Sequence, residues 1–140
     1  SPDRLFNCQC STCYCNLRLL NSCLEQKNYN AYYLIGLMYE KGLGIDYSIN
    51  LAKENYEKII QYGSNSLLVG KAQKNLADIL WSESKGEDDK SPYIELYEAS
   101  FRNGVYSSIT TLAKKFYDGD KIYKNLSRYF HYLTMGGRKK

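Results

Sequence analysis

The 140-residue chain has few prolines and no long hydrophobic run. Because proline disrupts helices, the presence of only Pro2 and Pro92 favours a largely helical protein. No apolar stretch approaches the roughly 20 residues that cross a bilayer, so we expect no membrane span. A cleavable signal peptide is not expected either, and this leaves the compartment open between the secretory pathway, or secretion, and the cytoplasm.

Clustered charge of one sign is also missing. Nineteen Lys and Arg residues are scattered among fifteen Asp and Glu residues, and only Arg138, Lys139 and Lys140 form a basic run. A surface that follows phosphates normally shows clustered basic residues, so nucleic acid is not an expected partner. The single histidine, His131, lies among aromatic residues without a Cys or Asp partner, and no glycine-rich loop follows a strand. We therefore expect no enzyme.

Cysteines are confined to the start of the chain, at Cys8, Cys10, Cys13, Cys15 and Cys23. Four thiolates so close together could hold zinc, although only Cys10 and Cys13 have the C-x-x-C spacing usual in structural zinc sites. In an oxidising compartment a disulfide such as Cys8 to Cys15 is the second interpretation. The third is a set of partly buried thiols without site chemistry. All three stay open.

The most regular pattern runs from residue 31 to residue 63. Small and apolar residues recur at helical spacing up to Tyr39, Gly42-Leu43-Gly44 interrupts them, and a second helical period runs on to Gly63. The glycines can take the left-handed backbone that ends a helix, and Ser48 can cap the next one. The pattern predicts two helices joined by a tight turn, a hairpin that leaves one apolar face for a neighbour.

Eight residues of this stretch carry a resemblance to the Sel-one-like repeat, a relative of the tetratricopeptide repeat. They are Ala31, Gly36, Tyr39, Gly42, Gly44, Ala52, Tyr56 and Gly63. The resemblance implies an all-α solenoid of stacked antiparallel helix pairs, wound as a right-handed superhelix of about seven helices. It also implies a non-enzymatic scaffold or adaptor for protein–protein interaction.

The register of this repeat returns twice along the chain. At an offset of 41 it matches Ala72, Leu76, Asp89, Tyr97 and Gly104, and at an offset of 77 it places Asn125 at the cap and Tyr129 at the position of Ala52. A register shifted by four residues, which pairs Tyr129 with Tyr56, also fits, and the first is preferred because it keeps Asn125 at the cap.

These matches predict the organisation of the chain. We expect a Cys-rich arm over 1–15 and one solenoid domain over 16–140, with a half repeat at 16–28, a repeat at 31–63, a degenerate repeat at 66–104 and a repeat at 106–140. Residues 64–71 are expected to form a long join. Residues 82–92 are expected to form a solvated loop in which Asp89 or Ser91 caps the next helix and Pro92 lies in its first turn.

By the same resemblance, the first helices of successive pairs line the concave side. The positions that face outward there are Leu34, Leu37, Lys41, Asn75, Asp78, Thr111 and Lys114. Leu34 and Leu37 indicate either a contact patch or packing against a neighbouring helix. We expect a partner protein or peptide on this face, with homo-oligomerisation as a further expectation. The alternative is a metal- or redox-responsive regulator that uses the four cysteines Cys8 to Cys15, with zinc as the cofactor.

Overall fold

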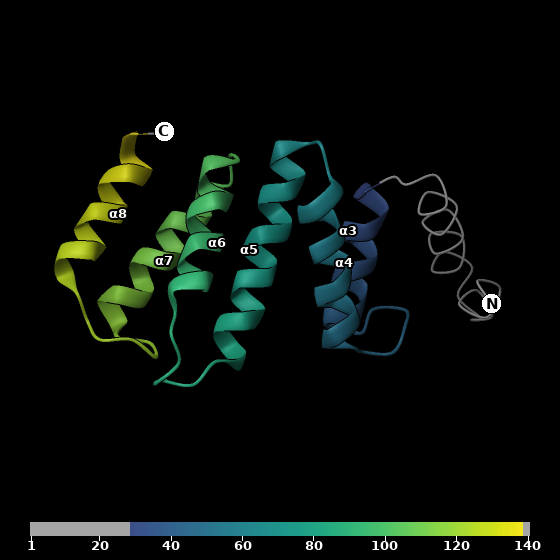
Figure 1. Ribbon diagram of the computed structural model, residues 1–140, viewed down its shortest axis with the longest axis horizontal. Coiled ribbons are helices and arrows are strands. Elements are labelled where there is room, and N and C mark those ends of the chain that lie inside the picture. The colour runs from purple at the N-terminus through teal and green to yellow at the C-terminus, as the bar shows by residue number, and fades with distance from the viewer. Residues whose placement is uncertain (1–28, 139–140) are drawn as a thin grey trace. The chain divides into compact units, whose positions relative to one another are not determined.

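The computed structural model describes residues 29–138, and over this range its regular secondary structure consists of helices joined by loops (Figure 1). The helices are α3 (Tyr29–Lys41), α4 (Ile49–Tyr62), α5 (Ser66–Glu83), α6 (Ser91–Arg102), α7 (Ser107–Asp118) and α8 (Leu126–Arg138). The predicted all-α class of antiparallel helix pairs is confirmed. Six helices in this range agree with about seven in the chain, because the helix expected at 16–28 lies outside the described residues.

The chain divides into two compact units at Gly63 and Ser64. In the first unit, α3 and α4 form a hairpin whose turn contains Gly42 and Gly44, both in the left-handed region at φ 65° and 77°. Ser48 caps α4, since its hydroxyl accepts a hydrogen bond from the Leu51 amide at 3.3 Å. The predicted turn and cap are both confirmed.

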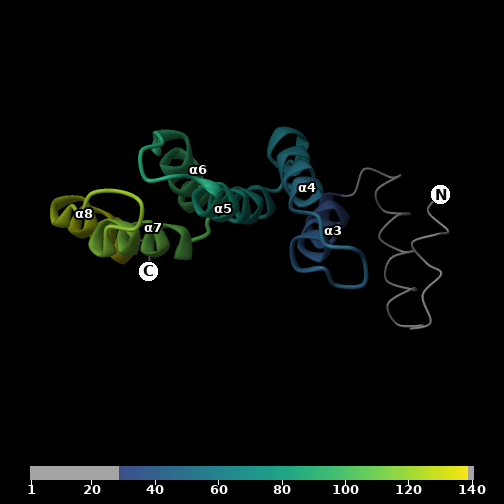
Figure 2. The same ribbon diagram turned by 90° about the horizontal axis from the view of Figure 1, so that it is seen from below.

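The second unit consists of two further hairpins, α5 with α6 and α7 with α8, and α6 also packs against α7 (Figure 2). Its core is one apolar cluster contributed by α5, α6, α7 and α8. The fully buried side chains of this cluster include Trp81, Tyr97, Leu112, Phe116 and Tyr132. Burial of this kind supplies most of the stability of a helical unit of this size.

Each hairpin contains one buried tyrosine on its second helix, and the three are Tyr56, Tyr97 and Tyr132. Asn125 caps α8, because its side-chain oxygen accepts from the Arg128 amide at 3.0 Å, as the preferred register predicted. Tyr132 lies seven positions after this cap, whereas Tyr56 lies eight positions after Ser48. Neither sequence register therefore aligned Tyr132 with Tyr56.

Two local predictions are wrong. Residues 64–71 are no join, because α5 already begins at Ser66, and the Asn65 side chain caps it by accepting from the Leu68 amide at 3.0 Å. The N-cap of α6 is Lys90, which makes no side-chain cap bond, so neither Asp89 nor Ser91 caps the helix. Asp89 instead accepts from the Ser91 amide at 3.0 Å. Pro92 lies in the first turn of α6, as predicted.

Candidate binding surface

Three of the seven predicted contact residues lie on α3 in the first unit. Leu34 is 47% exposed and Lys41 is exposed, whereas Leu37 is half-buried. The opposite side of α3 packs into the hairpin through Ala31, Ile35 and Gly36, all of which are buried. Leu34 is therefore an apolar side chain that the packing of its own hairpin leaves in solvent.

The other four predicted residues lie in the second unit, Asn75 and Asp78 on α5 and Thr111 and Lys114 on α7. Asn75, Asp78 and Thr111 are half-buried, and the side chain of Lys114 is 77% exposed. That all seven residues form one continuous surface stays a prediction.

Asp78 has a structural role in addition to any role in binding, because it links α5 to α6. Its carboxylate accepts a hydrogen bond from the Tyr97 hydroxyl at 2.5 Å and from the Lys74 ammonium at 3.0 Å. Burial raises the pKa of Tyr97 well above its usual range, and the hydrogen bond to Asp78 raises this pKa further. The carboxylate is thus positioned by two partners, and the Asp78 side chain is still 42% exposed.

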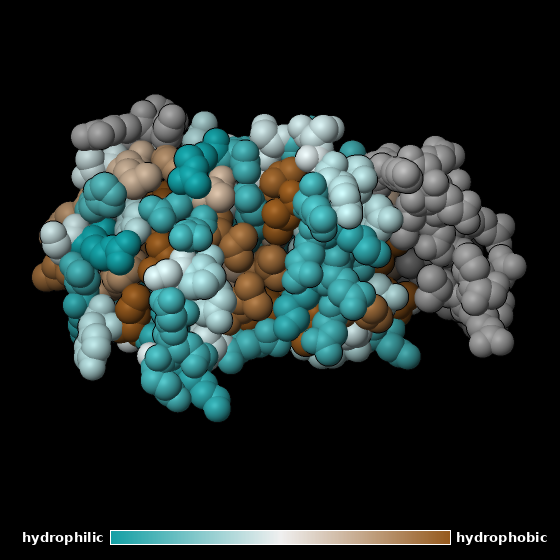
Figure 3. Space-filling model, in the orientation of Figure 1, coloured by the Kyte–Doolittle hydropathy of each residue, from teal (hydrophilic) through white to brown (hydrophobic). Residues whose placement is uncertain are grey.

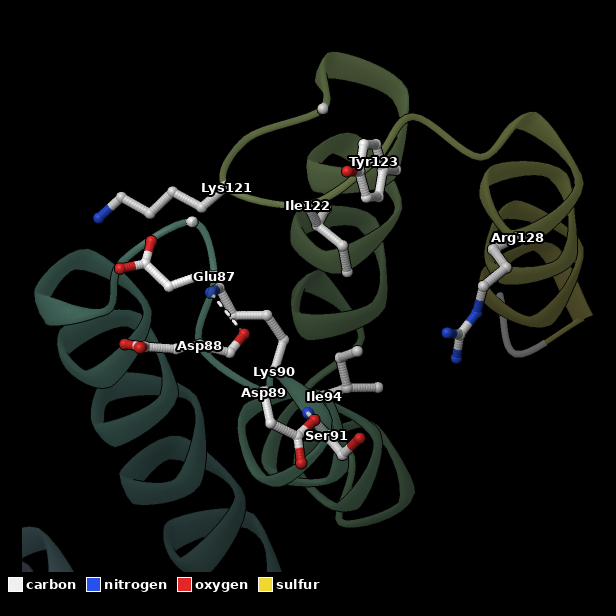
Figure 4. Close-up of a pocket in the computed structure, with 12 residues that line it drawn as sticks. Glu87, Asp88, Asp89, Lys90, Ser91, Ile94, Lys121, Ile122, Tyr123 and Arg128 are labelled. Atoms are coloured by element: carbon white, nitrogen blue, oxygen red, sulfur yellow. Dashed lines mark hydrogen bonds between the residues drawn. The ribbon is translucent and has the colours of Figure 1, made fainter.

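The second unit also contains a hollow of about 780 Å³ that the sequence did not point to (Figure 4). The α5–α6 loop supplies one wall, including Glu87, Asp88 and Asp89, and the α7–α8 loop and the start of α8 supply the other. In Figure 4 the Arg128 side chain faces the hollow from α8, on the side opposite Glu87 and Asp88.

Lysine side chains fix both loops around this hollow. Lys90, which is only 5% exposed, donates to the Lys85 carbonyl and, at 3.0 Å, to the Asp88 carbonyl. Lys121 has a left-handed backbone at φ 58°, and its ammonium donates to the Trp81 carbonyl at 3.2 Å and the Ser82 carbonyl at 2.6 Å. Lys121 therefore adds a donor to carbonyls in the last turn of α5, where the Trp81 carbonyl also accepts from the Ser84 amide at 3.2 Å and the Ser84 hydroxyl at 2.6 Å.

The charges in the hollow are mixed, and the cations already have partners within the protein. The Arg128 guanidinium lies 4.7 Å from the centre of the Phe116 ring and donates to the Tyr132 hydroxyl at 2.9 Å. Asp89 has a lowered pKa, first because its side chain accepts from the Ser91 backbone amide. The acidic run at 87–89 forms part of one wall only, and the other wall lies some thirty residues further on, so the sequence did not bring the two together.

The cysteine predictions, at Cys8, Cys10, Cys13, Cys15 and Cys23, fall outside the described residues. Within residues 29–138, no three His, Cys, Asp or Glu side chains come together as a metal site would require. None of the helices there is both long and apolar enough to cross a membrane. His131 is exposed. The centres of its ring and of the Tyr132 ring lie 5.2 Å apart, and the ring planes meet at 61°.

Together these features define an all-α repeat protein, in which similar helix pairs present exposed side chains of their first helices. The particular repeat fold is that of Sel1 repeat proteins. A Sel1 repeat protein from Oxalobacter formigenes matches with a TM-score of 0.68 and 20% identity, over 87% of this chain and 47% of that one. The protective antigen c5321, present in uropathogenic Escherichia coli strains and displaying an SLR fold, matches with a TM-score of 0.66 and 21% identity.

The match to c5321 covers 86% of this chain and 25% of the antigen, so this chain spans less than half the length of either neighbour. Neither a protein-family model nor a curated protein sequence matches the chain. The resemblance inferred from residues 31–63 is confirmed at the level of the fold.

Proposed function

We propose that the protein is a non-enzymatic scaffold that binds a partner protein or peptide on the outward face of its first helices. The observation that carries this proposal is the exposed Leu34 on α3, with half-buried Leu37 beside it one turn further along the helix. An exposed apolar side chain on a helix whose other face is already packed is suited to contact with a partner.

The repeat fold supports the same conclusion. Helix pairs of this kind offer a surface that exists before the partner arrives, so binding orders few additional groups and costs less entropy. On α7, the exposed ammonium of Lys114 supplies a polar contact, and on α5 the Asp78 carboxylate, held by Tyr97 and Lys74, supplies another. Apolar groups of a partner suit α3 in the first unit, and polar groups suit α5 and α7 in the second.

Site-specific photocrosslinking tests the proposal. A photoreactive amino acid replaces Leu34 in one variant and Leu51 in another, and both are irradiated in native lysate. Leu51 is 39% exposed on α4, the second helix of the same hairpin, which makes it a matched control. We expect a discrete adduct of one partner chain from position 34 and none from position 51. Equal adducts from both positions, or none from position 34, would contradict the proposal.

A further inference from the structure

Helix α8 carries apolar side chains that its packing does not use. Leu126, Phe130 and Leu133 are 56%, 60% and 38% exposed. Their spacing of four and three residues places them on one face of the helix. The packed face is a different one, on which Tyr132 stacks with Phe116 of α7 at a ring distance of 5.8 Å.

Aromatic rings extend this face onto α7. The Tyr117 ring lies 5.0 Å from the Tyr129 ring, which in turn lies 5.1 Å from the Phe130 ring. Tyr117 is 53% exposed. We call Tyr117, Leu126, Phe130 and Leu133 the α8 patch; Figure 3 shows apolar side chains over α8 at the left edge of the view.

Equivalent helices of the same chain are polar where α8 is apolar. With the buried tyrosines Tyr56, Tyr97 and Tyr132 taken as equivalent, the positions of Leu126, Phe130 and Leu133 correspond to Asn50, Glu54 and Glu57 on α4 and to Ser91, Glu95 and Glu98 on α6. Five of these six polar residues are exposed, and Glu98 is half-buried. Because α6 stays polar here although another helix pair follows it, repeat stacking does not account for the α8 patch.

The charge on α8 itself has one sign. At the end of α7 the two acidic side chains each lie near a lysine, Asp118 at 3.9 Å from the Lys114 ammonium and Asp120 at 3.7 Å from the Lys115 ammonium. Among the helices of residues 29–138, α8 alone contains no Asp or Glu, and residues 121–140 of the sequence hold six Lys and Arg residues and no acidic residue. A second copy of the chain would bring the same positive charge to the contact, which disfavours self-association. The occupant of the patch is therefore expected to be apolar inside and negatively charged at its surface.

We propose that the α8 patch docks on the surface of an anionic lipid bilayer. Leu126 and Phe130 enter the boundary between headgroups and acyl chains, and the amphipathic ring of Tyr117 lies at headgroup level. Lys124, which is exposed, and the excess of basic over acidic residues in the sequence from 121 to 140 favour attraction to the anionic headgroups. A bilayer accepts side chains that protrude from a single helix without a preformed groove, and this favours it over an acidic protein partner.

Co-sedimentation of the full chain with vesicles tests the proposal. We expect binding to phosphatidylcholine vesicles that contain about one-third phosphatidylserine, little binding to pure phosphatidylcholine, and loss of binding in high salt. The double variant Leu126→Ser/Phe130→Ser should lower the vesicle partition coefficient at least about tenfold. Leu51→Ser, the exposed leucine on α4, should leave it unchanged.

A Phe130→Trp variant reports contact directly. The only native tryptophan, Trp81, is 1% exposed, so brominated lipids should quench the added tryptophan and leave the wild-type emission unchanged. Absence of binding to anionic vesicles, or binding that the double variant leaves intact, would overturn the proposal. So would a dimer, seen by analytical ultracentrifugation, that the double variant dissociates, or capture of an acidic protein by the patch without any vesicle binding.

Discussion

Tyr56 and Gly36 illustrate how single residues set the distance between the helices of a pair. A Cβ atom added at Gly36 would lie 2.7 Å from Cε1 of the fully buried Tyr56 ring. The Tyr56 hydroxyl donates to the Glu40 carboxylate at 2.8 Å, so the ring is held at both its edge and its tip. The second and third hairpins have Ala77 and Ala113 at the corresponding position, and both are buried.

Gly36→Ala should therefore destabilise the first unit. Overpacking against the Tyr56 ring costs about 1–3 kcal/mol, and the better helix propensity of alanine offsets up to about 1 kcal/mol of that cost. Hydrogen exchange of peptides from 29–63 measures the change, and peptides from 64–138 serve as the internal reference. Unchanged or slower exchange in 29–63 would show that the ring moves aside without cost.

The raised pKa of the buried Tyr97 predicts that the protein loses stability at high pH. Its pKa is raised from a reference value of 10.0, first by burial and then by the Asp78 carboxylate. The unfolded chain releases this proton near pH 10 while the folded chain keeps it, so stability is complete below about pH 10 and falls as the pH rises further.

Tyr97→Phe removes this titration. Above pH 10 the free energy of unfolding should then decrease less steeply with pH than in the wild type. The two slopes should differ by up to about 1.4 kcal/mol per pH unit. Burial also raises the pKa of Tyr132, so part of the slope remains until Tyr132→Phe is added. Urea unfolding at a series of alkaline pH values measures both variants, and slopes identical to the wild type would contradict the burial of Tyr97.

The loops between helices are more ordered than their composition indicates. Residues 84–90 contain five charged residues, yet Lys90 is buried, and the Lys85 amide donates to the Asp88 carboxylate at 2.8 Å. In the α7–α8 loop Lys121 plays a similar part, since its ammonium donates to carbonyls near the end of α5. Lysine side chains thus supply hydrogen-bond donors to carbonyls of the loop and of the helix end.

Lys90→Met keeps the buried aliphatic stem and removes the ammonium. Loss of its hydrogen bonds to the Lys85 and Asp88 carbonyls should lower the stability of the second unit by about 1–3 kcal/mol. Amide exchange in 84–91 should become faster. Lys85→Met, at an exposed position in the same loop, is the control and should change the exchange rates little. Equal effects of the two variants would show that the hydrogen bonds of the buried Lys90 ammonium do not stabilise the loop.

Regular features of the molecule could be predicted from the sequence, and irregular ones could not. Local backbone chemistry at Gly42, Gly44, Ser48 and Asn125 is sufficient to predict turns and caps, and all four have the expected role. The early start of α5 escaped prediction because the Asn65 cap has no counterpart in the repeat pattern.

Contacts between residues far apart in the sequence account for the other omissions. Lys121 donates to the Trp81 and Ser82 carbonyls, which lie 40 and 39 residues earlier in the sequence, and spacing alone cannot assign them to it. The exposure of Leu34 followed from its register, but the exposure of Phe130 became evident only when Tyr132 was aligned with Tyr56 and Tyr97. The exposure of Leu34 on α3 could therefore be predicted, whereas the hollow in the second unit and the α8 patch could not.

The most direct test of the scaffold proposal is the dissociation constant of the partner that position 34 captures. It should be measured by calorimetry for the wild-type chain, for Leu34→Ser/Leu37→Ser and for the α4 control Leu51→Ser, with helical content checked by circular dichroism. If two leucines are buried at the interface, the dissociation constant of the double variant should be at least tenfold larger than that of the wild type, a loss of about 1.4 kcal/mol of binding free energy. The control should show no change. Equal affinity of the wild-type chain and the folded double variant would contradict the proposal.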